Sequence, residues 1–195
     1  MCGADASVVA VTGETGDELG RWRIFGERAI YDDPSLWVGQ VDVEVPGGER
    51  VWSPVVRVHR AVTVLLRNDE KQVLLLWRYR FVKDRIGGEL PGGLVDRDED
   101  PADAAVRELE EQTGYRARRL EPVMTFEPLP GLVDAEHFVF EGRDPEWVTD
   151  PVFGPGEIGG ARWWSLSAIR SLIAEGRIWN AESLVPLLWL LATEI

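Results

Sequence analysis

The sequence predicts an α/β fold in which strands flank a central helix and two further helices close the chain. Residues 61–66 and 73–77 are apolar runs on either side of an Asn-Asp-Glu turn, which is typical of two buried strands. Residues 100–114 carry the start and stop signals of a helix, and two more helices are predicted at 167–175 and 181–193. The length of 195 residues fits one domain, or one domain with a small appendage.

The amino-terminal part is interpreted as a tail followed by a small β region. Polar residues occupy every second position from Gln40 to Glu44, which indicates a strand, and the Pro46–Gly48 turn returns the chain through residues 51–58. We therefore expect a hairpin or small sheet with a role in dimerisation or substrate binding. The predicted divisions are a flexible tail at 1–20, the β region at 21–60 and the main domain at 61–195.

After the central helix, strands are predicted at 120–126, 137–140 and 161–166. Between the last two, residues 143–160 are rich in Pro, Gly and Asp, so this segment is predicted to be a long loop. Loops of this length in compact domains are usually functional or disordered.

Composition limits the partners. The net charge of −13 argues against a nucleic-acid backbone or an anionic membrane, both of which need basic patches. A phosphate ligand would meet the same repulsion unless cations offset it, and Arg78, Arg80, Lys83 and Arg85 form a local basic cluster. The single cysteine fits a reducing compartment, and we find no signal-peptide pattern or membrane-spanning run, so we expect a cytoplasmic protein.

The central helix has well-defined ends and an acidic face. Asp100 can cap it, Pro101 suits its first turn and Gly114 ends it. Glu108, Glu111 and Gln112 stand at i, i+3 and i+4, so they share one face. Converging side-chain oxygens suit a hard divalent cation such as Mg²⁺, which prefers oxygen ligands and often accompanies a phosphorylated substrate.

The spacing around this helix is more specific than its composition. It runs Gly93, five residues, Glu99, seven residues, Arg107-Glu108-Leu109, one residue, Glu111, Gln112, one residue, Gly114. This pattern resembles the signature box of the Nudix hydrolases, which cleave a nucleoside diphosphate linked to another group, and six of the seven fixed positions match. The resemblance implies a Nudix-type α/β/α sandwich with a mixed sheet.

The departure from the box is Gln112, where the family has a second consecutive glutamate. Glutamine is nearly isosteric with glutamate but neutral, and its amide nitrogen cannot ligate a hard cation. Three explanations stay open: natural variation with the metal held by other carboxylates, a nucleotide-binding domain that has lost catalysis, or an engineered Glu-to-Gln change.

Sequence outside the box resembles the ADP-ribose pyrophosphatase branch. Residues 77–93 are similar to a strand that carries arginines toward the substrate, which implies that Arg78 and Arg80 bind it; their alternation with Tyr79 also fits a solvated strand face. Pro130 and Glu136 resemble the branch's substrate-binding loop, with the plain alternatives of a turn proline and an exposed acid.

The resemblance also implies roles for individual residues. Mg²⁺ or Mn²⁺ would be held by Glu108, Glu111, the position of Gln112 and the backbone carbonyl of Gly92. A Glu99–Arg107 ion pair would brace the box, with Gly93 and Gly114 as its structural glycines. The general base would be Glu157, in a glycine-rich segment able to close over substrate; a solvated loop acid is its alternative interpretation.

The expected function is metal-dependent hydrolysis of a nucleoside diphosphate sugar, ADP-ribose first, to a nucleoside monophosphate and a sugar phosphate. Glu111, Gln112 and Glu157 are the expected catalytic residues. The alternatives are a nucleoside triphosphate-sanitising Nudix enzyme and a nucleotide-binding domain impaired by Gln112. We expect a homodimer with a small-molecule substrate and no nucleic-acid or membrane partner.

Overall fold

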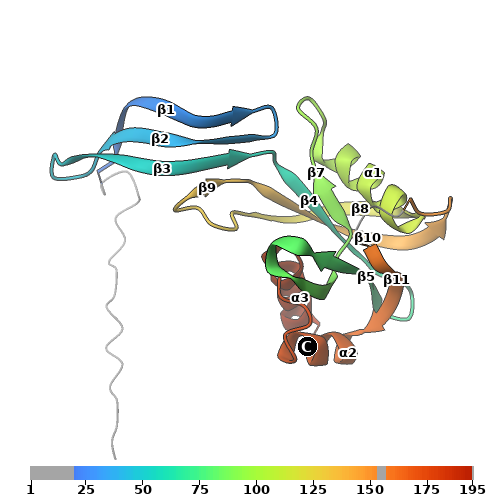
Figure 1. Cartoon of the computed structure of the whole chain (residues 1–195). Helices are drawn as coiled ribbons and strands as arrows, with labels where there is room; N and C mark the ends of the chain where they lie inside the picture. Colours follow the sequence, from blue (N-terminus) through green and yellow to red (C-terminus); the bar gives the residue numbers. More distant parts are fainter. Residues whose placement is uncertain (1–19, 153–156, 195) are drawn as a thin grey trace, which may run out of the picture. The chain divides into compact units, whose positions relative to one another are not determined.

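A computed structural model describes residues 20–152 and 157–194 and divides the chain into two compact units, with the boundary after Val56 (Figure 1). Residues 1–19 of the predicted tail lie outside the described residues. No helix in the described part of the chain is long and apolar enough to span a bilayer.

The first unit is built from strands that lie side by side in the order β1 (Arg23–Asp33), β2 (Leu36–Glu44) and β3 (Arg50–Val58). The strands predicted from Gln40 onward correspond to β2 and β3, whereas β1 was not predicted. It pairs antiparallel with β2, from Arg23 opposite Glu44 to Asp33 opposite Leu36, and is exposed along its whole length.

The second unit contains a mixed sheet and an antiparallel sheet, in the orders β7-β4-β10-β8 and β11-β5-β6. In the mixed sheet, β4 and β10 are parallel, and the outer pairs are antiparallel. In chain order, the elements of the second unit are β4 (Ala61–Leu66), β5 (Gln72–Arg80), the short 3₁₀ turn η1 (Phe81–Lys83), β6 (Arg85–Glu89), β7 (Gly92–Leu94), α1 (Pro101–Thr113), β8 (Tyr115–Phe126), β9 (Val133–Asp134), β10 (His137–Trp147), β11 (Glu157–Ser165), α2 (Leu166–Ala174) and α3 (Ala181–Thr193).

Strands β4 and β5 separate two apolar cores, because successive side chains of a strand point to opposite faces. On one face, Val62, Val64 and Leu66 belong to the core that includes Ala105 and Leu109 of α1. On the other face, the partners are α2 and α3, through the buried residues Leu65, Val73, Leu75, Ile169, Leu187 and Leu190. Helices therefore cover both faces of these strands (Figure 1), which confirms the predicted α/β class with a mixed sheet.

Helix α1 begins and ends where its local signals predict. Asp100 is its N-cap and accepts a hydrogen bond from the Ala102 N–H at 2.8 Å, with Pro101 as the first helical residue. Gly114 ends the helix in the left-handed region, at φ 74°, where glycine carries little steric cost.

The predicted loop at 143–160 is wrong over both of its ends. Strand β10 continues to Trp147, and β11 already begins at Glu157. Pro145 is accommodated opposite Ala117 of β8, because the ladder of β10 with β4 ends at Gly142. A proline, which has no N–H to donate, therefore needs no ladder bond on that side.

Candidate active site

The candidate site forms where side chains of α1 pack directly against the backbone of β7. A Cβ at Gly93 would collide with the carboxylate of Glu108, and a Cβ at Gly92 would collide with the carbonyl oxygen of Val62. Glycine at both positions therefore lets the strand lie directly against the helix on one side and against β4 on the other.

Arg107 joins the loop before α1 to the helix itself. Its Nε and Nη2 atoms donate to the two Glu99 carboxylate oxygens at 2.9 and 2.8 Å, and Nη2 also donates to the Leu94 carbonyl at 3.0 Å. Its Nη1 atom donates to Oε1 of Glu108 at 2.7 Å. Hydrogen bonds from Arg107 and from the Asp96 N–H lower the pKa of Glu99 to about 2.

Gln112 makes three hydrogen bonds at the centre of the box. The Gly92 N–H donates to its Oε1 at 3.0 Å, while its Nε2 donates to the Gly92 carbonyl at 2.8 Å and to Oε2 of Glu108 at 2.7 Å. Two of the oxygens implied as metal ligands thus converge on one point. The side chain of Gln112 presents a nitrogen, not an oxygen, to that point.

The donor set fits a hard divalent cation in part. The Gly92 carbonyl and the Glu108 carboxylate already approach one another, and Glu111 adds an exposed carboxylate whose Oε2 lies 3.7 Å from Nη1 of Arg107. These are the oxygen donors that Mg²⁺ or Mn²⁺ prefers. Among the described residues, however, no three His, Cys, Asp or Glu side chains are grouped so that they could hold a metal by themselves.

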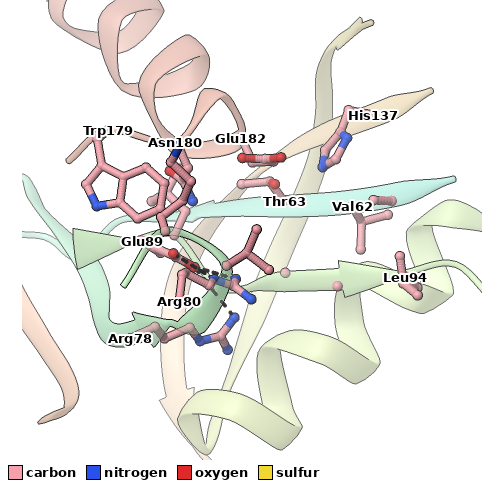
Figure 2. Close-up of a pocket in the computed structure, with 16 residues that line it drawn as sticks. Val62, Thr63, Arg78, Arg80, Glu89, Leu94, His137, Trp179, Asn180 and Glu182 are labelled. Atoms are coloured by element: carbon pink, nitrogen blue, oxygen red, sulfur yellow. Dashed lines mark hydrogen bonds and ion pairs between the residues drawn. The ribbon is translucent and has the colours of Figure 1, made fainter. Parts of the chain in front are cut away.

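A cavity of about 460 Å³ adjoins the box through Gly92 and Gly93. Its charged lining consists of three cationic side chains and two carboxylates, so a chain of net charge −13 presents a locally cationic pocket. Volumes of this size suit small-molecule ligands. The side chains that decide its chemistry are Arg78, Arg80, Lys83, Glu89, His137, Asn180 and Glu182 (Figure 2).

Glu89 holds the two arginines of β5 at the cavity. Arg80 donates to both Glu89 oxygens, at 2.9 and 2.5 Å, and Nη1 of Arg78 lies 4.0 Å from Oε2 of Glu89. Arg78 and Glu89 are buried, so the solvated strand face that the sequence left open does not describe Arg78. Glu89 was missed by sequence reasoning; the available signal was a lone acid within the apolar and glycine-rich residues 86–93.

The remaining polar lining comes from residues that are distant in the sequence. In Figure 2, His137 and Glu182 lie toward the upper side of the cavity, and Arg78 and Arg80 toward the lower side. Burial lowers the pKa of His137, and the charge of Glu182 opposes that shift. No local spacing pointed to either residue, because β10 and α3 meet here only through the fold.

Three predicted residues lie elsewhere or are described only in part. Pro130 is in an exposed turn before β9, Glu136 is half-buried just before β10, and neither lines the described cavity. Glu157 begins β11, where its backbone is in register with that of Arg78. The glycine-rich segment before it falls partly outside the described residues, at 153–156.

The chain that precedes this segment is tied to the end of α1. The N–H groups of Val148 and Thr149 donate to the Gly114 carbonyl at 2.9 and 3.4 Å. The Val152 N–H donates to the Glu111 carbonyl at 2.7 Å. The backbone that leads toward Glu157 therefore bonds directly to the helix that carries the box.

Because Arg78 and Arg80 share the Glu89 carboxylate, Glu89→Gln should strongly lower the stability of the folded protein. Removing one partner of a buried ion pair leaves a buried charge without that partner, so we expect the free energy of unfolding to fall by about 3 kcal/mol. Glu110→Gln on α1 is the matched control, because Glu110 pairs with the exposed Arg116 and should cost under about 1 kcal/mol. Urea unfolding measures both, and equal losses would contradict the assignment.

The Glu99–Arg107 pair predicts an acid-sensitive contribution to stability. The pKa of Glu99 is about 2 in the folded chain, against an ordinary value of 4.5. Because the folded pKa is the lower one, the contribution is complete above the ordinary value and is lost as pH falls toward 2. The stability difference between wild type and Glu99→Gln should therefore shrink between about pH 5 and about pH 2.5 in urea titrations. A difference that stays constant over this range would rule the contribution out.

Comparison with known proteins agrees with the box. The NUDIX domain model matches residues 57–186. The chain is 40% identical over 171 residues to the CMP-5'-(N-acetyl-N-hydroxy-3-aminopropyl)phosphonate hydrolase of Streptomyces rubellomurinus, covering 86% of this chain and 81% of that protein. It is 36% identical over 99 residues to the ADP-ribose pyrophosphatase of Bacillus subtilis, covering 51% of this chain and 54% of that protein.

The fold has a counterpart among solved structures. A crystal structure of an ADP compounds hydrolase superposes with a TM-score of 0.76 at 19% identity, covering 90% of this chain and 97% of that one. This likeness concerns the fold alone, whereas the family model spans more than half of the chain. The protein is therefore a member of the Nudix hydrolase family, in its ADP-ribose pyrophosphatase-like branch.

Proposed function

We propose that the protein hydrolyses the P–O–P bridge of a nucleoside diphosphate sugar, with ADP-ribose as the first candidate, to a nucleoside monophosphate and a sugar phosphate. The observation that carries the proposal is the locally cationic cavity that opens onto Gly92 and Gly93 beside the acidic box. A diphosphate needs positive charge on its oxygens, and the cavity brings such charge to the helix that carries Glu108 and Glu111.

Arg78 and Arg80 are proposed to bind the diphosphate. A guanidinium donates two parallel hydrogen bonds to a phosphate, which fixes orientation as well as charge. Glu89 holds both side chains before substrate arrives, because it is buried and already bonded to Arg80. The arginines therefore need little reordering on binding, which favours affinity.

Hydrolysis adds one water across the bridge. The water oxygen bonds to one phosphorus, the bridging P–O bond breaks, and the bridging oxygen leaves with the other phosphoryl group. A divalent cation bound near Glu108, Glu111 and the Gly92 carbonyl would offset charge on the diphosphate and lower the pKa of the attacking water. We propose Glu157 as the group that accepts the water proton, because its backbone lies in register with Arg78.

A CMP-linked phosphonate is the second candidate substrate. It is favoured by the 40% identity to a hydrolase of such a compound, a match that covers 86% of this chain. Both candidates share a nucleoside monophosphate joined through oxygen to a second phosphorus, so the same cationic cavity and box would serve either.

A substrate panel tests the function. With Mn²⁺ present, ADP-ribose or a CMP-linked phosphonate should yield AMP or CMP, measured by chromatography, and Glu111→Gln should lower kcat by about 100-fold or more if Glu111 helps to hold the cation. Glu110→Gln, whose partner is Arg116, should retain activity. Pyrophosphate release from nucleoside triphosphates would instead support a sanitising enzyme. Tight nucleotide binding without turnover of any compound would support a non-catalytic domain.

We also propose that the chain forms a homodimer through β1. This strand is at an edge of its sheet and exposes apolar side chains, among them Ile24 and Ile30, which are 74% and 71% exposed. Light scattering should give twice the chain mass of 21.9 kDa, and Ile24→Lys with Ile30→Lys should halve it. Leu188→Lys on α3, also an exposed position, is the control. A monomeric wild-type protein would contradict this proposal.

A further inference from the structure

Gln112 bonds to Gly92 and Glu108 in only one orientation of its amide. As placed, its oxygen faces the Gly92 N–H, and its nitrogen faces the Gly92 carbonyl and the Glu108 carboxylate. Rotating the amide by half a turn would set an acceptor against two acceptors and a donor against a donor. All three hydrogen bonds would be lost, so the chemistry of the neighbours fixes the nitrogen at the point where the oxygens converge.

A glutamate at position 112 would behave differently at the same point. A carboxylate has no N–H, so it could not donate to the Gly92 carbonyl or to Glu108. It would also bring a second negative charge beside the Glu108 carboxylate, which repels it unless positive charge lies between them. The neutral amide of Gln112 avoids this repulsion and donates hydrogen bonds to both the Gly92 carbonyl and the Glu108 carboxylate.

We propose that Gln112 is a positioning residue that takes the place of a bound cation between Gly92 and Glu108. Its three hydrogen bonds hold β7 on α1 without a metal. The proposal rests on the proposed function only in locating the cation site at this helix. Binding of a divalent cation is then weak in the free protein and becomes tight when the diphosphate of the substrate supplies further oxygen ligands.

The neighbouring side chains support weak cation binding in the free protein and tighter binding in the presence of substrate. The two oxygens of Glu108 are already engaged, one by Arg107 and the other by Gln112. The side chain of Glu111 is 56% exposed, so it is the box carboxylate most open to a cation that arrives with substrate. In the described part of the chain, no group of three acidic or histidine side chains could hold a metal unaided.

The three hydrogen bonds of Gln112 to Gly92 and Glu108 are called the clamp below. Thermal unfolding without substrate tests it. In EDTA, Gln112→Glu and Gln112→Met should both lower Tm by roughly 5 °C, because each loses the hydrogen bonds made by the amide nitrogen. Mn²⁺ should restore the Tm of Gln112→Glu, and should leave wild type and Gln112→Met nearly unchanged. Gln40→Glu is the matched control for added charge, since Gln40 accepts from Arg28 and a glutamate there keeps that bond.

Direct Mn²⁺ titration, followed by electron paramagnetic resonance, gives a second measurement. Without nucleotide, Gln112→Glu should bind Mn²⁺ about 10–100-fold more tightly than wild type or Gln40→Glu. A non-hydrolysable ADP-ribose analogue should raise the Mn²⁺ affinity of wild type toward that of the variant.

The proposal is overturned if wild type alone gains as much Tm from Mn²⁺ as Gln112→Glu does, or binds Mn²⁺ as tightly. It is also overturned if Mn²⁺ without nucleotide raises the Tm of wild type by roughly 5 °C, an outcome that can be measured even if a variant does not fold. These readouts do not use turnover, so they separate failure of the clamp from failure of the proposed function. If the clamp holds but the analogue has no effect on Mn²⁺ affinity, the link to substrate is wrong and Gln112 is structural only.

Discussion

Because β7 carries no Cβ at positions 92 and 93, α1 can set the Glu108 carboxylate directly against strand backbone, and the rest of the site depends on that contact. It brings the Gly92 peptide within reach of Gln112 and lets Arg107 of the helix reach the carbonyl of Leu94 at the end of β7. A larger residue at Gly93 would collide with the Glu108 carboxylate of α1, and a larger residue at Gly92 would collide with the backbone of β4 at Val62. The hydrogen bonds that converge on the box would then be broken together.

The charge around the cavity differs in sign from the net charge of the chain. A chain of net charge −13 still contains a locally cationic pocket, because two arginines on one strand share a single buried acid. Glu89 therefore has two effects: it offsets part of the repulsion between Arg78 and Arg80, and it fixes where their guanidinium groups lie. At Arg107 the signs are exchanged, because one guanidinium is shared by the two carboxylates of Glu99 and Glu108.

The features that could be predicted from the sequence are those determined by residues close together in the chain. The bounds of α1 follow from Asp100 and Gly114, and its acidic face follows from helix geometry, so both are visible in the sequence alone. The extension of β10 was missed because its partner residues on β8 lie about thirty positions away, and pairing outweighed a Pro-rich composition. The cavity lining at His137 and Glu182 has no shared spacing at all, and the orientation of the Gln112 amide depends on a glycine twenty positions earlier.

The hydrogen bond between Val152 and the last turn of α1 limits how far Glu157 can lie from that helix. Only residues 153–156 lie between Val152, which is bonded to the Glu111 carbonyl, and Glu157, which is in register with Arg78. A fully extended chain gains at most about 3.6 Å per residue, so the Cα atoms of Val152 and Glu157 are less than about 20 Å apart. An insertion between Val152 and Glu157 would raise that upper limit without changing any described residue that lines the cavity.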